Sequence, residues 1–174
     1  AVETEDAPQG APPIGAGRRR GLVLHKLMEE VLTGETNEEL GALTARALVL
    51  SASLAVAEEE AGAPDPGEMA AAVLKTFALP DVARLRRQLV PEFTLYAMRD
   101  ASSALSARAD AVAIAEGEAN VVIDWKSDVA PDVRDIARHT QQLSAYLEAS
   151  GAARGALVYM TRGEVRWVDP PVGG

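Results

Sequence analysis

Two hydrophobic periodicities follow one another along the chain, and their order is what most constrains its fold. Apolar residues recur at helical spacing from residue 18 to about 32, where Leu24, Leu27 and Met28 begin a stripe. From residue 89 onward, short segments rich in strand-forming residues are separated by turn signals. Helices, then a three-stranded meander, then one helix and two strands predict an α/β layer domain.

The expected elements can be bounded from caps and turn signals. Helices are predicted over residues 18–32, 37–61 with Asn37 as its cap, 67–78, 80–88 and 132–150, the last ended by Gly151. Strands are predicted over residues 89–98, 105–115, 119–125, 155–161 and 164–168, with Arg162-Gly163 as the turn between the last two.

The first 17 residues differ in composition from the rest of the chain. They are rich in Ala, Pro, Gly and acidic residues and have no helical or strand period, which is typical of a disordered arm or linker. We therefore expect one domain over residues 18–170, mostly helical over 18–88 and sheet-bearing over 89–168. A total of 174 residues is enough for one such domain with a real core.

Composition excludes several kinds of site. The chain has no cysteine, which rules out disulfides, thiolate zinc sites, iron–sulfur clusters and cysteine nucleophiles. It also has no signal-like segment and no apolar run of membrane-spanning length. These absences predict a soluble, cytoplasmic protein that does not act at a membrane.

The net charge opposes unaided binding to nucleic acid. With 17 basic and 26 acidic residues the net charge is −9, the wrong sign for neutralising phosphates. Two explanations stay open for a nucleic-acid-binding function. The acidic residues could gather at a divalent-metal site and in a tail, or a partner domain could supply the basic track.

The stretch VVIDWKSD, residues 121–128, is the strongest local candidate for a site. Side chains alternate along a strand, so Asp124 and Lys126 point the same way. If Glu116-Gly117-Glu118 form a three-residue turn, Ala115 pairs with Ala119 and Asp110 lies opposite Asp124, with Cβ atoms roughly 5 Å apart.

Two carboxylates that close repel each other unless a positive charge lies between them. A divalent cation, with Lys126 beside it, would satisfy that need. A register slip of one residue would move Asp110 to the other face unless a bulge corrects it. Solvated surface charges at a strand end are the alternative explanation of the same three residues.

Two helices carry polar residues beside their apolar stripes. His25 lies at the edge of the first stripe, where a histidine is more often a boundary residue than a ligand. In the helix at 132–150, Ile136, Leu143 and Leu147 form the expected buried stripe. His139, Gln142 and Tyr146 run beside that stripe at i, i+3 and i+7, which an amphipathic helix with a polar border also explains.

Together these residues form a recognisable pattern. The segments G-L-V-L-H-K-L-M-E-E, R-A-D-A-V, V-I-D-W-K-S-D and H-x-x-Q-L-x-A-Y-L occur in this order over roughly residues 20 to 160. The pattern resembles the RecB-type nuclease domain of the PD-(D/E)XK superfamily, found in exonuclease V and AddA class helicase–nucleases. The resemblance implies a restriction-endonuclease-like core, a central mixed sheet flanked by helices, with a helical N-terminal half.

The resemblance also implies residue roles. His25, Asp110, Asp124 and the backbone carbonyl of Trp125 would bind Mg²⁺ or Mn²⁺, and Lys126 would position or deprotonate the attacking water. Gln142 and Tyr146 would orient the DNA backbone or Lys126, and Arg108 would contact a phosphate. Glu92 matches a frequent glutamate of the family, but its role is less defined, and an ordinary surface glutamate on a strand is an equally good interpretation of it. Without cysteine, the chain lacks the four-Cys iron–sulfur cluster of AddB-type relatives.

The function that the resemblance implies is metal-dependent hydrolysis of DNA phosphodiesters. An exonuclease is favoured over an endonuclease, acting in double-strand-break repair and recombination and fed with DNA by a helicase in the same or a partner polypeptide. Two alternatives stay open: an inactive nuclease-like structural or DNA-binding module of a helicase complex, and a standalone repair endonuclease.

Overall fold

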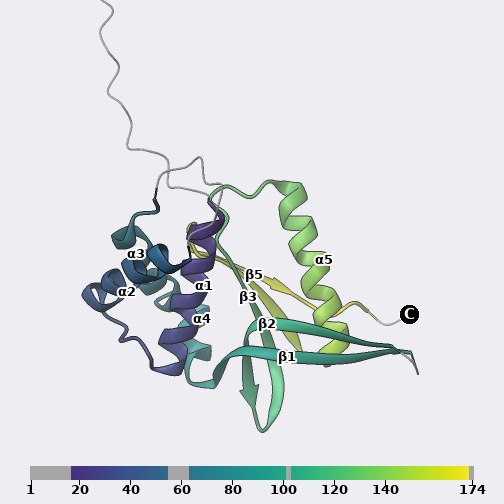
Figure 1. Ribbon diagram of the computed structural model, residues 1–174. Helices are drawn as coiled ribbons and strands as arrows, with labels where there is room; N and C mark the ends of the chain where they lie inside the picture. The colour runs from purple at the N-terminus through teal and green to yellow at the C-terminus, as the bar shows by residue number, and fades with distance from the viewer. Residues whose placement is uncertain (1–16, 55–62, 101–102, 173–174) are drawn as a thin grey trace, which may run out of the picture.

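A five-stranded sheet lies between two helical layers (Figure 1). The computed structural model describes residues 17–54, 63–100 and 103–172, so the arm predicted over residues 1–17 lies outside it except for Gly17. Four helices of the first half cover one face of the sheet and a single later helix covers the other. The predicted α/β class, with a mixed sheet and a helical N-terminal part, is confirmed.

The elements follow the predicted order. They are α1 (Arg18–Thr33), α2 (Leu40–Ser53), α3 (Pro66–Phe77), α4 (Pro80–Leu85) with the 3₁₀ turn η1 (Arg86–Gln88), β1 (Leu89–Asp100), β2 (Ser103–Ala115), β3 (Glu118–Lys126), α5 (Val133–Ser150), β4 (Arg154–Tyr159) and β5 (Glu164–Val168). The strands lie in sequence order across the sheet. All neighbours are antiparallel except β3 and β4, whose parallel pairing needs the crossover that α5 provides.

Strand β3 is buried from both sides and orients the side chains at its end. Val121, Ile123 and Trp125 pack into the core formed with α1 to α4, whereas Val122 packs into the core beneath α5. Because side chains alternate along the strand, Asp124 and Lys126 share the face of Val122 and point toward α5. The end of β3 therefore places two charged side chains between the sheet and that helix.

Several predicted boundaries need correction. Asn37 is not a cap: the N-cap of α2 is Glu39, and the Asn37 carbonyl accepts a hydrogen bond from Glu39 N. The helix predicted to reach residue 61 ends at Ser53, and residues 55–62 lie outside the described ones. The turn between β4 and β5 spans residues 160–163 rather than Arg162-Gly163 alone.

The last large helix begins and ends where the sequence indicates. Asp132 caps α5 through a reciprocal capping box with Asp135. Gly151 ends the helix with a φ of 67°, a left-handed conformation that glycine adopts readily.

The predicted turn between β2 and β3 is wrong, but the predicted register at the site is recovered. Ala115 pairs with Glu118, so the turn contains only Glu116 and Gly117, both with positive φ as a type I′ turn requires. That register alone would bring Asp110 opposite Ile123. A bulge at Asn120 shifts it by one residue, so that the last pair of the ladder is Ala111 with Ile123, and the next residues along the two strands are Asp110 and Asp124.

No helix in the described ranges is both long and apolar enough to span a bilayer.

Candidate functional site

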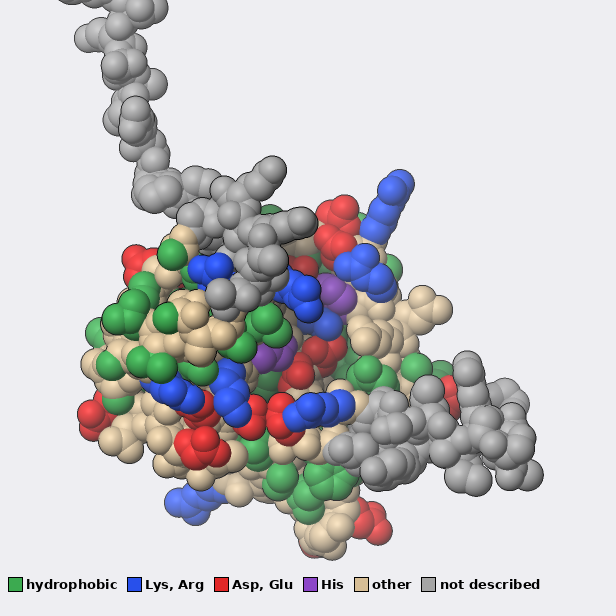
Figure 2. Space-filling model, viewed as in Figure 1, with side chains coloured by type: hydrophobic (Ala, Val, Ile, Leu, Met, Phe, Trp, Pro, Cys, Tyr) green, Lys and Arg blue, Asp and Glu red, His purple; other side chains and the backbone are tan. Residues whose placement is uncertain are grey.

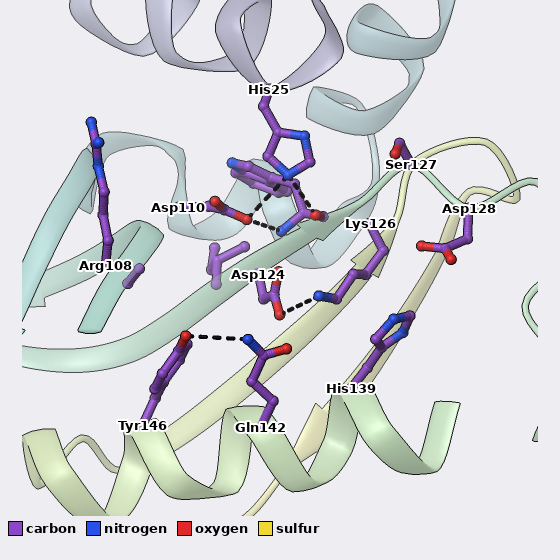
Figure 3. Close-up of a pocket in the computed structure, with 13 residues that line it drawn as sticks. His25, Arg108, Asp110, Asp124, Lys126, Ser127, Asp128, His139, Gln142 and Tyr146 are labelled. Atoms are coloured by element: carbon purple, nitrogen blue, oxygen red, sulfur yellow. Dashed lines mark hydrogen bonds and ion pairs between the residues drawn. The ribbon is translucent and has the colours of Figure 1, made fainter. Parts of the chain in front are cut away.

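A pocket of about 370 Å³ opens at the end of β3, between the sheet and α5, with α1 above it (Figure 3). It is lined by the residues predicted from sequence, His25, Arg108, Asp110, Asp124, Trp125, Lys126, Gln142 and Tyr146. Figure 2 shows acidic and histidine side chains in a hollow of the surface, with Lys and Arg side chains around it. Glu92 lies apart, in an adjoining cavity of about 130 Å³ that also touches His25 and Asp110.

A change in the packing of β2 brings Asp110 into this pocket. Ala111 packs on the α1 to α4 side of the sheet and Ala109 on the α5 side, although residues two apart in a regular strand face the same way. On the neighbouring strand β1, Glu92 has a left-handed φ of 50° at the same level. The Asp110 carboxylate then accepts a hydrogen bond from Trp125 N at 2.8 Å, which ties β2 to the end of β3 through a side chain.

His25 joins α1 to both carboxylate-bearing strands. Its Nδ1 lies 2.9 Å from Gly21 O, and its Nε2 lies 2.8 Å from Trp125 O and 3.4 Å from Asp110 Oδ2. Burial by itself would lower the pKa of His25, but the hydrogen bond and negative charge of Asp110, with the two carbonyls, raise it to about 9. At neutral pH the ring is therefore protonated and both nitrogens donate.

The two carboxylates of the pocket have opposite proton affinities. Burial, reinforced by the negative charge of Asp110, raises the pKa of Asp124 to about 6, although Lys126 opposes the shift. Burial also acts to raise the pKa of Asp110, but the hydrogen bond and positive charge of His25 outweigh it and lower that pKa. Asp124 Oδ2 lies 2.8 Å from Lys126 Nζ, and both side chains are mostly buried. Asp110 is thus paired with His25, and Asp124 is paired with Lys126.

Helix α5 forms the opposite wall of the pocket. Gln142 Nε2 donates to Tyr146 OH at 3.3 Å, so the two predicted residues contact each other one turn apart (Figure 3). His139 belongs to the buried stripe rather than lying beside it, and its Nδ1 lies 3.1 Å from Tyr159 OH. Burial and the charge of Lys126 lower the pKa of His139. Ile136, expected in the stripe, is only partly buried.

The predicted phosphate contact, Arg108, is paired within the protein. Its guanidinium forms an ion pair with Glu92, and both side chains are exposed at the mouth of the site. Arg108 can therefore reach a phosphate only in competition with that carboxylate.

The donor atoms fit a small divalent cation. His25 Nε2 lies 2.8 Å from Trp125 O and 3.4 Å from Asp110 Oδ2, so one imidazole nitrogen and two oxygens lie side by side. Carboxylate and carbonyl oxygens with one imidazole suit Mg²⁺ or Mn²⁺. In the described part of the chain no three histidine or acidic side chains surround a single point, so the closest donors are two side chains and a carbonyl.

Three polar residues that line the pocket, Ser127, Asp128 and His139, were not predicted as site residues. His139 was expected only at the polar border of its helix. The signal for His139 was available, because it lies three residues before Gln142 on the same helix face. For Ser127, the first residue after β3, the sequence carries no such signal.

The pKa of His25 predicts a pH-dependent stability when a chelator is present. The folded protein holds the His25 proton up to about pH 9 and an unfolded chain up to about 6.5, so this stabilisation is complete below pH 6.5 and lost as the pH rises to 9. Asp124, with a pKa of about 6, titrates mostly below that window, and the pKa values of Asp110 and His139 are lowered. Urea unfolding should show a falling free energy of unfolding across the window, and His25→Gln should abolish the fall. The same fall in His25→Gln would contradict the assignment.

Comparisons with known proteins place the chain in a family. The model of the PD-(D/E)XK nuclease superfamily matches residues 4–170. A search of curated proteins finds no match. Among solved structures, "Crystal structure of SSO0001" is similar at 18% identity over 91% of this chain and 81% of that chain, with a TM-score of 0.43, too low to transfer any property. Because the superfamily model covers nearly the whole chain, the protein belongs to the PD-(D/E)XK nuclease superfamily.

Proposed function

We propose that the protein is a divalent-metal-dependent deoxyribonuclease of the RecB type. The observation that carries the proposal is the contact of His25 Nε2 with Trp125 O and Asp110, beside an Asp124–Lys126 ion pair in one pocket. Membership of the nuclease superfamily supports the reaction class and DNA as the substrate. The reaction would be hydrolysis of a DNA phosphodiester.

Four groups would hold the cation: the imidazole of His25, the carboxylate of Asp110 and the Trp125 carbonyl, which already lie together, and the carboxylate of Asp124, which would turn toward them from its ion pair with Lys126. When bound, Mg²⁺ or Mn²⁺ supplies positive charge for the phosphate and lowers the pKa of a coordinated water. His25 must lose its proton to become a ligand, and the negative charge of Asp110 that raises its pKa remains beside it. Cation binding is therefore expected to release protons at neutral pH.

Lys126 would position the attacking water, and it would accept a proton from that water only as the neutral amine. Its ammonium is fixed by Asp124 at 2.8 Å and mostly buried, so it is held in one place next to the proposed cation. Gln142 and Tyr146 face the same pocket from α5 and would orient the DNA backbone or Lys126. Arg108 would contact a phosphate after its ion pair with Glu92 breaks.

We further propose that the domain is the exonuclease part of a helicase–nuclease that acts in double-strand-break repair and recombination. The order of the four motifs supports this branch of the superfamily. The net charge of −9 supports a partner that delivers DNA, because an acidic domain attracts phosphates poorly by itself. The helicase would be part of the same or a partner polypeptide.

One observation favours a second candidate, an inactive nuclease-like module of a helicase complex. The ion pairs His25–Asp110 and Lys126–Asp124 neutralise all four charges without any metal. Calorimetry with Mn²⁺ near neutral pH distinguishes the two functions, since an inactive module would bind no Mn²⁺ at this pocket. Cleavage of circular or branched DNA, tested beside linear DNA, would instead indicate a standalone repair endonuclease.

Removing the proposed metal ligand or the water-positioning lysine should stop the reaction. We expect Asp124→Ala to abolish Mg²⁺-dependent DNA cleavage, and Lys126→Ala to slow it by at least about 100-fold, the usual range for a lost acid–base group. Asp169→Ala, which removes an exposed ion pair with Arg154, serves as the control and should cleave like the wild type. Circular dichroism checks the fold, and undiminished cleavage by either site variant would refute the assignment.

The need for a delivering partner predicts weak activity of the isolated domain. Release of nucleotides from linear DNA should be slow for the domain alone and rise when it is joined to a helicase motor, because the motor raises the local concentration of DNA at the pocket. An equal rate with and without the motor would show that the domain recruits DNA unaided.

A further inference from the structure

Arg20 is a buried charge on α1 that lies outside the proposed catalytic set. Its side chain is 2% exposed. Its Nε and one terminal nitrogen form a bidentate pair with Glu68 of α3, at 2.9 Å and 2.6 Å. Such a pair has fixed geometry, but a buried ion pair usually adds little net stability over apolar packing. A role in fixing positions is therefore a better explanation of Arg20 than stability.

The remaining nitrogen of Arg20, Nη1, reaches the chain just beyond the site and donates to Ser127 O at 3.0 Å. Nη2, which already pairs with Glu68, also donates to the hydroxyl of Thr161 at 3.0 Å. Ser127 directly follows Lys126, where β3 ends and the ladder no longer holds the backbone. Arg20 thus ties α1 and α3 to the residue after the proposed water-positioning lysine.

Close packing at the neighbouring residue makes this contact specific. A Cβ added at Gly21 would lie only 2.9 Å from Ser127 Oγ, so an alanine there would force the Ser127 hydroxyl to move. Lys126 O meanwhile accepts a hydrogen bond from Met160 N at 2.9 Å. The backbone on both sides of the Lys126–Ser127 peptide is therefore held from two directions.

Two hydrogen-bonded contacts join α1 to the end of β3: His25 with Trp125 O, and Arg20 with Ser127 O. The first would be rearranged by a cation, because His25 Nε2 and Trp125 O are both proposed ligands. The second involves no proposed ligand and can persist in both states. Arg20 is therefore suited to hold α1 against the end of β3 whether or not a cation is bound.

We propose that Arg20, oriented by Glu68, is a positioning residue that fixes the end of β3 against α1 and so sets Asp124 and Lys126 relative to His25. The proposal rests on the proposed nuclease function. It assigns a role in the reaction to a residue pair that touches neither the proposed cation nor the substrate.

The chain offers a matched control. Arg46 of α2 and Glu30 of α1 form a second bidentate pair, at 2.8 Å and 2.6 Å, with Glu30 1% exposed. That pair does not contact the end of β3. Arg20→Lys and Glu68→Gln should therefore be compared with Arg46→Lys and Glu30→Gln, which disturb a second bidentate ion pair on α1, one in which the glutamate rather than the arginine is the buried partner.

The test measures kcat and KM for Mn²⁺-dependent cleavage of linear DNA, the Kd for Mn²⁺ by calorimetry, and Tm. We expect Arg20→Lys and Glu68→Gln to lower kcat and weaken Mn²⁺ binding by about 10-fold or more, with KM for DNA unchanged, as for residues that orient metal ligands. The Arg46 and Glu30 variants should lower Tm at least as much and leave kcat and Kd unchanged. Hydrogen exchange of the metal-free protein should be faster at the Trp125 and Met160 amides in the Arg20 and Glu68 variants and unchanged in the Arg46 and Glu30 variants.

The outcomes separate this inference from the function on which it rests. A wild type that neither binds Mn²⁺ nor cleaves DNA refutes the proposed function, and hydrogen exchange alone then decides the positioning role. The role of Arg20 is overturned if kcat falls in proportion to Tm in the variants of both ion pairs. It is also overturned if hydrogen exchange at the Trp125 and Met160 amides does not change. If Arg20→Lys does not fold, Glu68→Gln carries the test, because Glu68 is partly exposed and glutamine keeps an acceptor oxygen.

Discussion

The pairing of β3 between an antiparallel neighbour, β2, and a parallel one, β4, is the constraint on which the site depends. A strand paired on both edges and covered on both faces cannot shift or rotate without breaking two ladders and two cores. Its apolar residues alternate between those cores, so the side chains after Ile123 have fixed directions. Asp124 and Lys126 project toward α5 for this reason, while Trp125 anchors the strand end in the opposite core and presents its carbonyl to His25.

Charge is balanced locally across the pocket. Asp110 is matched by His25 from α1, and Asp124 by Lys126 from its own strand. The first pair lowers the pKa of Asp110, whereas burial near another carboxylate raises that of Asp124 to about 6. A divalent cation held by these residues would supply the positive charge that protonated His25 supplies to Asp110. Two adjacent carboxylates can therefore persist in the folded protein before any cation binds.

The fold class and the composition of the pocket were predictable from sequence because both depend on local patterns. The helical and strand periodicities predicted the helical and sheet layers, and the order of the motifs predicted a shared site. One pocket is indeed lined by His25, Asp110, Asp124, Lys126, Gln142 and Tyr146. The hairpin shows how such a prediction can succeed with a faulty step. The assumed three-residue turn is wrong, yet the bulge at Asn120 restores the register that it implied.

Contacts between segments that lie far apart in the sequence could not be predicted. Arg20 and Glu68 are 48 positions apart, and nothing in either segment marks them as a buried pair. The left-handed Glu92 and the change of packing side at Asp110 likewise arise from strand twisting and tertiary packing, which no local pattern encodes.

The most direct test of the proposed metal centre is a crystal structure of the protein soaked with Mn²⁺, using anomalous scattering to locate the ion. The proposed site predicts an anomalous peak bounded by the carboxylates of Asp110 and Asp124, the Trp125 carbonyl and His25, with the His25–Asp110 ion pair replaced by contacts to Mn²⁺. An empty pocket that keeps both ion pairs, or Mn²⁺ bound only elsewhere, would contradict it.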